Sequence, residues 1–300
     1  MQKLILVDGS GLIYRGFYAI PPFLKSPSGQ LTNAVFGFAN ILLSLISVHK
    51  PDYIAVAFDK KGPTFRHKAF AEYKATRVKA PQELYDQIPL VKKVVETFGM
   101  PLFEKEGFEA DDILATIVEQ TAAQSDIETL IATGDFDMFQ VAGPHVSILY
   151  PGKGFKDAQI LREEDIEKKY GLLPLQIPDY KGLAGDSSDN IPGVHGRGDV
   201  GATNLLQKYK TLDGIYEHID EIQGALKKKL EDGKRDAFMS RDLAVLVRNV
   251  PTDFSLEDCR VKKFGVDSLH ALFGELGFKS LQKRLDDLYG TETAQGTLFG

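Results

Sequence analysis

Two short stretches of the chain carry five carboxylates between them. The first contains Glu109, Asp111 and Asp112, and the second contains Asp135 and Asp137. Carboxylates this close in sequence repel one another unless a positive charge lies between them. Hard oxygen ligands of this kind favour Mg²⁺ or Mn²⁺ over metals that prefer thiolates. The pattern therefore predicts a divalent-metal site, and the other elements are interpreted as the scaffold that completes it.

Two further acids stand at the ends of predicted strands. Residues 3–7 and 53–58 are short apolar runs that end at Asp8 and Asp59. In open α/β sheets, ligands bind at the carboxyl ends of the strands. The alternative for Asp8 is that it caps only the helix that follows it. The alternative for the acids at residues 109–112 is that they complement the dipole of the helix that begins there. Two strands that both end in Asp exceed what capping predicts, so we favour the metal site.

One segment of this acidic chain is strongly basic. The net charge of −6 argues weakly against a nucleic-acid partner. Residues 60–79, however, carry one acid, Glu72, among seven cations: Lys60, Lys61, Arg66, Lys68, Lys74, Arg77 and Lys79. We expect a helix over residues 65–77, in which cations for phosphates and rings for base stacking suit a single strand of nucleic acid. The alternative is a charged face that is merely solvated.

Strands and helices alternate over the first half of the chain. Predicted strands cover residues 3–7, 53–58, 128–133 and 146–150, and predicted helices cover 32–49, 82–98 and 109–122. This alternation predicts the α/β class, with a mostly parallel central sheet flanked by helices. We expect an α/β core over 1–154 that includes a basic arch at 60–81, a helical region over 155–290, and a loose tail over 291–300.

A glycine-rich turn precedes a predicted helix in the second half. The turn covers residues 185–198, and the helix covers 200–209. Closely spaced glycines before a helix let backbone N–H groups approach a phosphate. An ordinary turn between helices explains the pattern at least as well. Asp186 and Asp189 in this turn could cap helices or reach the acidic cluster, and the helices predicted over 237–247 and 268–273 look structural.

The composition excludes several classes of protein. The most apolar run, residues 34–48, is interrupted by Asn40, Ser44 and Ser47, so no membrane span is predicted. The single cysteine, Cys259, excludes an internal disulfide and fits a reducing compartment. Cysteine and histidine are not clustered as a zinc site requires. We expect a cytoplasmic monomer with no membrane partner.

The order of these motifs resembles one known family over nearly the whole chain. It is similar to the 5′-3′ exonuclease domain found at the N-terminus of bacterial DNA polymerase I, a member of the flap-endonuclease group. The resemblance rests on LVDGS at 6–10, YRGFYA at 14–19, TNAVFGF at 32–38, VAFD at 56–59, TFRH at 64–67, YKATR at 73–77, EADD at 109–112, TGDFD at 133–137 and GDSSDNIPGV at 185–194.

The resemblance implies a two-metal nuclease with a flap-endonuclease core, a helical arch and a helix-hairpin-helix-like element over residues 185–209. The implied metal ligands are Asp8, Asp59, Glu109, Asp111, Asp112, Asp135, Asp137, Asp186 and Asp189. The implied catalytic cations are Arg66, Lys74 and Arg77, and the implied DNA-binding residues are Arg15, Lys68, Tyr73, Gly193, Gly196, Arg197 and Gly198. Tyr73 is the residue expected to stack on an unpaired base.

The resemblance also implies cofactors and partners. The cofactors are two Mg²⁺ ions, which Mn²⁺ can replace, and a K⁺ ion at the helix-hairpin-helix-like turn. The substrate is DNA with a 5′ flap, a nick or a 5′ end, with RNA primer–DNA hybrids as a further substrate. The expected reaction is phosphodiester hydrolysis in primer removal and DNA repair, with a polymerase domain in cis or in trans as partner.

One departure from the family pattern falls in the glycine-rich turn. The family usually has Pro-Gly-Ile-Gly and then Lys-Thr-Ala after Gly-Val, whereas residues 193–202 read GVHGRGDVGA. Loss of the lysine and gain of Asp199 should weaken the grip on phosphate unless Arg197 compensates. Two other functions stay open, a single-strand ribonuclease on a related acidic α/β core and a non-catalytic module that binds DNA junctions. The complete acidic set favours the nuclease.

Overall fold

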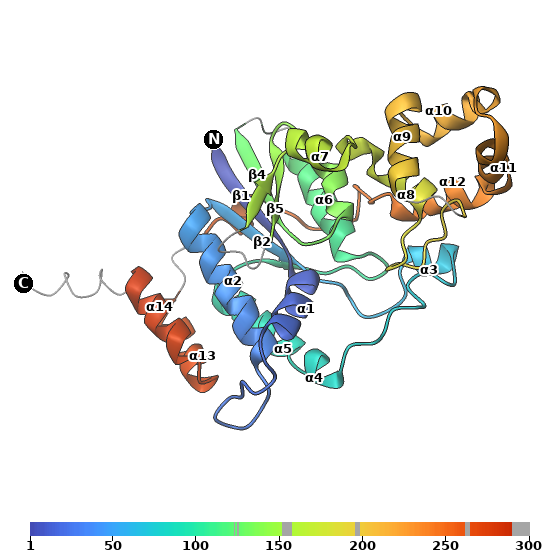
Figure 1. The fold of residues 1–300 in the computed structure, drawn as a ribbon. Coiled ribbons are helices and arrows are strands. Elements are labelled where there is room, and N and C mark those ends of the chain that lie inside the picture. Colours follow the sequence, from blue (N-terminus) through green and yellow to red (C-terminus); the bar gives the residue numbers. More distant parts are fainter. Residues whose placement is uncertain (123, 125, 152–157, 196–198, 262–264, 290–300) are drawn as a thin grey trace, which may run out of the picture.

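The computed structural model of the chain describes all residues except 123, 125, 152–157, 196–198, 262–264 and 290–300. A central sheet has helices on both faces, and a group of helices from α8 to α12 extends to one side of it (Figure 1). The tail predicted over 291–300 and the domain boundary predicted near residue 154 lie outside the described residues.

The sheet has the strand order β3-β2-β1-β4-β5-β6. The strands are β1 (Gln2–Asp8), β2 (Tyr53–Ala57), β3 (Leu102–Phe103), β4 (Ile127–Ala132), β5 (Val146–Tyr150) and β6 (Gln159–Leu161). All neighbours from β3 to β5 pair in parallel, and β6 pairs antiparallel with β5. The mostly parallel sheet is therefore confirmed. The sequence did not predict β3 and β6, because runs of two and three residues are too short to show a strand pattern.

Alternate residues of β1 pack into two cores on opposite faces of the sheet. Leu4 and Leu6 belong to one core, and Ile5 and Val7 belong to the other, because successive side chains of a strand point to opposite faces. The core around Ile5 is completed by α1 (Gly9–Ala19), α2 (Asn33–His49), α5 (Ile88–Thr97), α13 (Val266–Glu275) and α14 (Lys279–Tyr289), and α6 (Ala110–Thr121) contributes to the other. Burial of both faces explains why residues 4–7 of β1 are a continuous apolar run.

Helices dominate the chain after β6. They are α7 (Glu163–Tyr170), α8 (Ile177–Ala184), α9 (Asp199–Tyr209), α10 (Leu212–Glu217), α11 (Gly224–Asp232) and α12 (Lys234–Ala244), followed by α13 and α14. The helices predicted over 200–209, 237–247 and 268–273 correspond to α9, α12 and α13, with shifted bounds. Within the described part of the chain, no helix is long and apolar enough to cross a membrane.

The basic segment folds differently from the helix predicted over residues 65–77. Helix α3 (Phe65–Ala69) has five residues, and turns follow over 71–76. Lys74 has a positive φ of 57°, and its backbone N–H donates to the carbonyl of Asp189 at 2.8 Å. A contact with a distant loop thus takes the place of the next helical hydrogen bond. The helix prediction is wrong beyond Ala69.

Residues 82–98 form two helices where one was predicted. Helix α4 (Gln82–Tyr85) ends before Gln87, and α5 begins directly after it. The Gln87 side chain is buried, where its Oε1 accepts from the N–H of Ala34 at 2.8 Å. Its Nε2 donates to Asn33 Oδ1 at 3.1 Å. The break therefore lets Gln87 supply a partner to the N–H groups at the start of α2, which otherwise lack one.

Candidate metal centre at the carboxyl edge of the sheet

Five carboxylates line one pocket of about 200 Å³ at the carboxyl edge of the sheet: Asp8, Asp59, Glu109, Asp111 and Asp135. Asp8 ends β1, while Asp59 and Asp135 follow β2 and β4. Glu109 is the N-cap of α6, and Asp111 lies in its first turn. Three strand ends and one helix start, which are far apart in sequence, thus bring their acids to a single place.

Asp8 caps a helix and faces the pocket at the same time. Its Oδ1 accepts from the N–H of Gly11 at 2.8 Å, and its Oδ2 accepts from Thr133 Oγ1 at 2.9 Å. A Cβ at position 11 would lie 2.2 Å from Asp8 Oδ2, so a larger residue there would have to displace the Asp8 carboxylate. Asp59 Oδ1 accepts from the N–H of Ala110 at 2.8 Å, which ties the end of β2 to the start of α6. Asp8 can therefore cap α1 and still face the pocket as a candidate metal ligand.

The carboxylates of this pocket are costly to ionise together. Burial, together with the nearby charges of Asp59 and Asp135, raises the pKa of Asp8 to about 7. The pKa of Asp111 is also well above its usual value because of burial and the charges of Asp135 and Asp8. A cation between them would remove this penalty. The donor set consists of hard carboxylate oxygens, which fits a divalent ion of the Mg²⁺ or Mn²⁺ class.

A second acidic group lies beside the first. It consists of Asp137, at the start of the 3₁₀ turn Asp137–Val141, and of Asp186 and Asp189, in the loop between α8 and α9. Among the described residues, these three alone have carboxylate oxygens that all lie within 4.8 Å of one another. The loop holds its shape because Asp186 Oδ1 accepts from Ser188 N–H at 2.8 Å.

Basic side chains neutralise this second group. The Lys181 ammonium contacts both Asp137 Oδ1 and Asp186 Oδ2. Arg77 pairs with Asp189. Lys74 Nζ lies 2.6 Å from Glu109 Oε1 and 3.8 Å from Asp189 Oδ2. Two acidic groups of different character thus lie side by side. Within the described residues, the aspartates of the first group have no such close ion pairs, whereas cations contact all three aspartates of the second.

Family models cover most of the chain. Residues 3–171 match the 5′-3′ exonuclease N-terminal resolvase-like domain, and residues 172–267 match the 5′-3′ exonuclease C-terminal SAM fold. The chain belongs to the 5′-3′ exonuclease family. The two matches meet between residues 171 and 172, which places α7 with the sheet and α8 with the helical half.

Curated relatives of this 5′-3′ exonuclease chain are DNA polymerases. It is 40% identical over 286 residues to DNA polymerase I of Caldicellulosiruptor bescii, and this alignment covers 95% of this chain and 33% of the relative. It is also 40% identical over 287 residues to DNA polymerase I of Bacillus subtilis, in an alignment that covers 95% of this chain and 32% of the relative. The chain therefore spans about a third of the length of the curated relatives it matches.

Solved structures share the fold of this exonuclease chain. The T5 5′-exonuclease with bound divalent metal ions (zinc) matches with a TM-score of 0.66 at 22% identity, over 96% of this chain and 99% of the other. The catalytic core of Rad2 in complex with DNA substrate matches with a TM-score of 0.62 at 19% identity, over 96% and 91% of the two chains. Both matches extend through the sheet and the helical half.

Asp112 does not join the acidic clusters of the exonuclease chain. It is fully buried, and its two oxygens accept from Arg66 NH1 and NH2 at 2.8 Å each. Its Oδ1 also accepts from the N–H of Val247 at 2.9 Å. In this structure Asp112 is directed toward Arg66 and away from the carboxylate pocket. Arg66 is likewise held inside the protein, since it is 2% exposed and its guanidinium also donates to the Leu243 and Val245 carbonyls.

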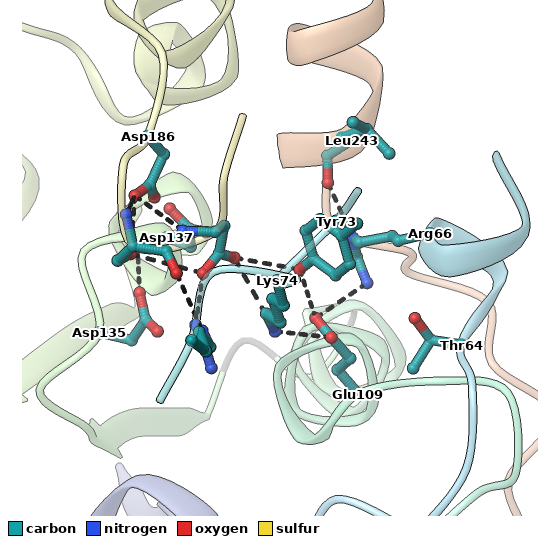
Figure 2. A network of polar contacts seen from close by, with 12 residues as sticks. Thr64, Arg66, Tyr73, Lys74, Glu109, Asp135, Asp137, Asp186 and Leu243 are labelled. Atoms are coloured by element: carbon teal, nitrogen blue, oxygen red, sulfur yellow. Dashed lines mark hydrogen bonds and ion pairs between the residues drawn. The ribbon is translucent and has the colours of Figure 1, made fainter. Parts of the chain in front are cut away.

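Tyr73 is also placed differently from the prediction. Its side chain is 3% exposed, so its ring is not accessible to an unpaired base in this structure. Its hydroxyl donates to Glu109 Oε2 at 3.0 Å and lies 3.1 Å from Asp189 Oδ2 (Figure 2). The proximity of these carboxylates and burial raise its pKa far above the usual value. Tyr73 therefore bridges carboxylates and fixes the segment that carries Lys74.

The remaining predicted residues range from exposed to buried, and three of them lie outside the described part. Arg15 lies on α1 and is partly buried, and Lys68 is exposed on α3. Gly193 is buried in the loop after α8. The residues at 196–198, which include the predicted Gly196, Arg197 and Gly198, lie outside the described residues.

Sequence reasoning missed one residue of the site, Lys181. It lies in the middle of α8 and is 5% exposed. A lysine is almost never fully buried unless it is paired. Its neighbours Tyr180 and Gly182 give no sequence signal for burial, and only the fold brings it to Asp137.

The loop that carries Asp186 and Asp189 depends on Gly193. Gly193 has a φ of 61°, and a Cβ there would lie 2.3 Å from the N atom of Gly185. We expect Gly193→Ala to lower the free energy of unfolding by at least about 2 kcal/mol, since strained backbone and steric overlap add. Urea denaturation with chelator measures this. Gly29→Ala is the control, because its φ is 88° but nothing lies within 4 Å of its Cβ position. Equal losses for both variants would contradict the steric argument.

Proposed function

We propose that the chain is a Mg²⁺-dependent 5′ nuclease that hydrolyses DNA phosphodiester bonds at 5′ flaps, nicks and 5′ ends, with Mn²⁺ able to replace Mg²⁺. The observation that carries this proposal is the composition of one pocket. Five carboxylates and two cations, Lys74 and Arg77, line the same 200 Å³ space. Carboxylates suit metal ions, and the cations beside them suit the phosphate on which those ions act.

The two acidic groups divide the ligand roles. Asp8, Asp59 and Asp111 would hold one ion, and Asp137, Asp186 and Asp189 would hold the other. Asp135 lies between the groups, since its charge raises the pKa of both Asp8 and Asp137. When bound, such ions activate a water molecule as nucleophile and stabilise the charge of the transition state. The water oxygen attacks phosphorus and the P–O3′ bond breaks, which leaves a 5′-phosphate and a 3′-hydroxyl.

Lys74 and Arg77 are the proposed catalytic cations. They pair with Glu109 and Asp189 at the wall of the pocket. If metal ions neutralise these carboxylates, the two cations become free to pair with the scissile phosphate. Positive charge that faces the developing negative charge lowers the barrier to hydrolysis. Arg66 has no such role in this proposal, because Asp112 binds it inside the protein.

A groove of about 720 Å³ next to the pocket suits the single strand. Its lining includes Lys74, Arg77 and Lys79 and the rings of Tyr14 and Tyr85. Tyr14 is 40% exposed and Tyr85 is 38% exposed, so both rings can reach a base. Rings that stack on bases and cations that follow phosphates form a typical single-strand site. We assign base stacking to these two tyrosines in place of Tyr73.

The duplex is assigned to the helix-hairpin-helix-like element over residues 185–209. Its described parts are the loop after α8 and the helix α9. In this proposal the glycines at 196 and 198 and Arg197 contact the duplex backbone, the buried Gly193 shapes the loop that leads to them, a K⁺ ion binds at the turn, and Arg15 and Lys68 add phosphate contacts. Because the curated relatives are DNA polymerases about three times as long, we also propose that a polymerase domain acts with this chain in primer removal and repair.

Cleavage of a labelled 5′-flap duplex tests the proposal. The duplex is incubated with Mg²⁺ or with chelator, beside a single-stranded RNA of the same sequence as the flap. We expect cuts near the flap junction with Mg²⁺, none with chelator, and intact RNA. Cleavage of the RNA alone would support a ribonuclease. Binding of the flap without cleavage in Mg²⁺ or Mn²⁺ would support a non-catalytic junction-binding module.

A further inference from the structure

Lys181 occupies a position that a metal ion would otherwise fill. It lies on α8 with 5% of its surface exposed, and its ammonium contacts Asp137 Oδ1 and Asp186 Oδ2. These two carboxylates belong, with Asp189, to the group whose oxygens all lie within 4.8 Å of one another. Burial of an ammonium is costly unless its partners are close and charged. Here both conditions are met.

Comparison of the two acidic groups shows what the ammonium does. No three oxygens from Asp8, Asp59, Asp111 and Asp135 come as close together as those of the second group. Asp8 and Asp111 have raised pKa values. In the second group the Lys181 charge is the main influence that lowers the pKa of Asp186 to about 2, against burial, and it also acts to lower the pKa of Asp137, which burial still raises to about 7. The second group thus already holds a cation in contact with two of its carboxylates.

An ammonium and a divalent ion cannot share the same two oxygens, because the cations repel each other at contact distance. An ion that binds between Asp137 and Asp186 must therefore move the Lys181 ammonium away. Space for that movement exists, since Lys181 also lines a pocket of about 820 Å³ together with Ser187 and Ser188. A flexible four-carbon stem allows the ammonium to turn into this pocket.

We propose that Lys181 is an internal counter-ion that competes with the second metal ion for Asp137 and Asp186, so that this ion binds more weakly than the first. This rests on the proposed function, since it takes the two acidic groups as metal sites. Lys181 is a positioning residue in this scheme. It keeps the second group folded and ready without metal, and it sets the metal concentration at which the second site fills.

Titration with Mn²⁺ in the absence of DNA tests this inference. Electron paramagnetic resonance of free Mn²⁺ gives the number of bound ions and both dissociation constants. We expect Lys181→Met to lower the dissociation constant of the second ion at least about tenfold, because the competing charge is gone, and to leave the first within about threefold. Lys169→Met is the matched control. Lys169 is exposed and lines the same pocket, but its ammonium lies over the Tyr150 and Tyr170 rings.

A general electrostatic effect of the pocket would tighten Mn²⁺ equally in both methionine variants and would overturn the proposal. An unchanged or weaker second site in Lys181→Met would also overturn it. Lys181→Arg keeps the charge, and we expect its second site to stay as weak as that of the natural protein.

Folding of the variant can be read in the same titration. If Lys181→Met unfolds without metal, circular dichroism should show that Mn²⁺ restores the fold below the concentration that fills the second site of the natural protein. Failure to fold in saturating Mn²⁺ would make Lys181 purely structural and would refute the inference. The proposed function fails separately, if the natural protein binds no Mn²⁺ or does not cut the flap.

Discussion

Asp135→Asn should lower the turnover of flap cleavage in Mg²⁺ by at least about 100-fold, a loss typical of removing one charge-stabilising group. Asp135 lines the carboxylate pocket, and its charge raises the pKa of Asp8, Asp111 and Asp137. It therefore interacts electrostatically with acids of both groups. Its Oδ1 accepts from the Asp137 N–H at 2.9 Å, a bond that an asparagine oxygen preserves. The loss should thus come from the missing charge and not from a changed loop.

The same substitution should stabilise the protein when metal is absent. The pKa of Asp8 is raised from 3.8 to about 7 in the folded state, so the metal-free fold loses stability as pH rises between these values. Removal of the neighbouring charge of Asp135 reduces that loss. We expect a higher melting temperature than that of the natural protein at pH 8 with chelator. Asp287→Asn, on the exposed surface of α14, is the control for both measurements. Turnover within twofold of the natural protein would refute the ligand role.

The sequence predicts the sheet edge well because local signals set it. Apolar runs that end at Asp8 and Asp59 fix two strand ends, and the strand before Thr133 fixes a third. Parallel strands place their carboxyl ends at one edge, so the convergence of these acids follows from topology alone. The edge strands β3 and β6 could not be found this way, because two or three residues are too few to show an alternation of apolar and polar side chains.

The direction of each acid at the start of α6 was harder to predict. Asp111 and Asp112 are adjacent, and successive residues of a helix point about 100° apart. Asp111 faces the carboxylate pocket, while Asp112 faces Arg66 inside the protein. Helical geometry could have shown that the two acids serve different places. It could not have shown which one faces the pocket, because that depends on how α6 packs on the sheet.

The fold of the basic segment depends on contacts with distant residues, which a local sequence pattern cannot show. Its sequence is compatible with a helix, but the N–H of Lys74 bonds the Asp189 carbonyl, and the Asn190 side chain bonds the Glu72 carbonyl at 2.7 Å. These partners lie more than a hundred residues away in the chain. Lys181 was missed for the same reason, since only the fold reveals that a mid-helix lysine is buried between two aspartates.

Arg66→Met should lower the free energy of unfolding by about 3–5 kcal/mol, the usual cost of removing one partner of a buried ion pair. Arg66 and Asp112 are 2% and 0% exposed and bond through both guanidinium NH groups at 2.8 Å. The variant leaves the Asp112 carboxylate buried with its charge uncompensated. It also leaves the carbonyls of Leu243 and Val245 without the guanidinium donors. Urea denaturation with chelator measures the loss, and Lys68→Met, exposed on the same helix α3, is the control.

Asp112→Asn then separates a structural role from a ligand role. If Asp112 only holds Arg66, the substitution should reduce stability while the dissociation constants for Mn²⁺ stay within about threefold of those of the natural protein. Combining it with Arg66→Met should cost less than the sum of the two single losses, because the second change no longer breaks an intact pair. Near-normal stability of Arg66→Met together with lost flap cleavage would reverse this assignment. Arg66 would then act on the substrate, and Asp112 would be free to bind metal, as the sequence alone predicted.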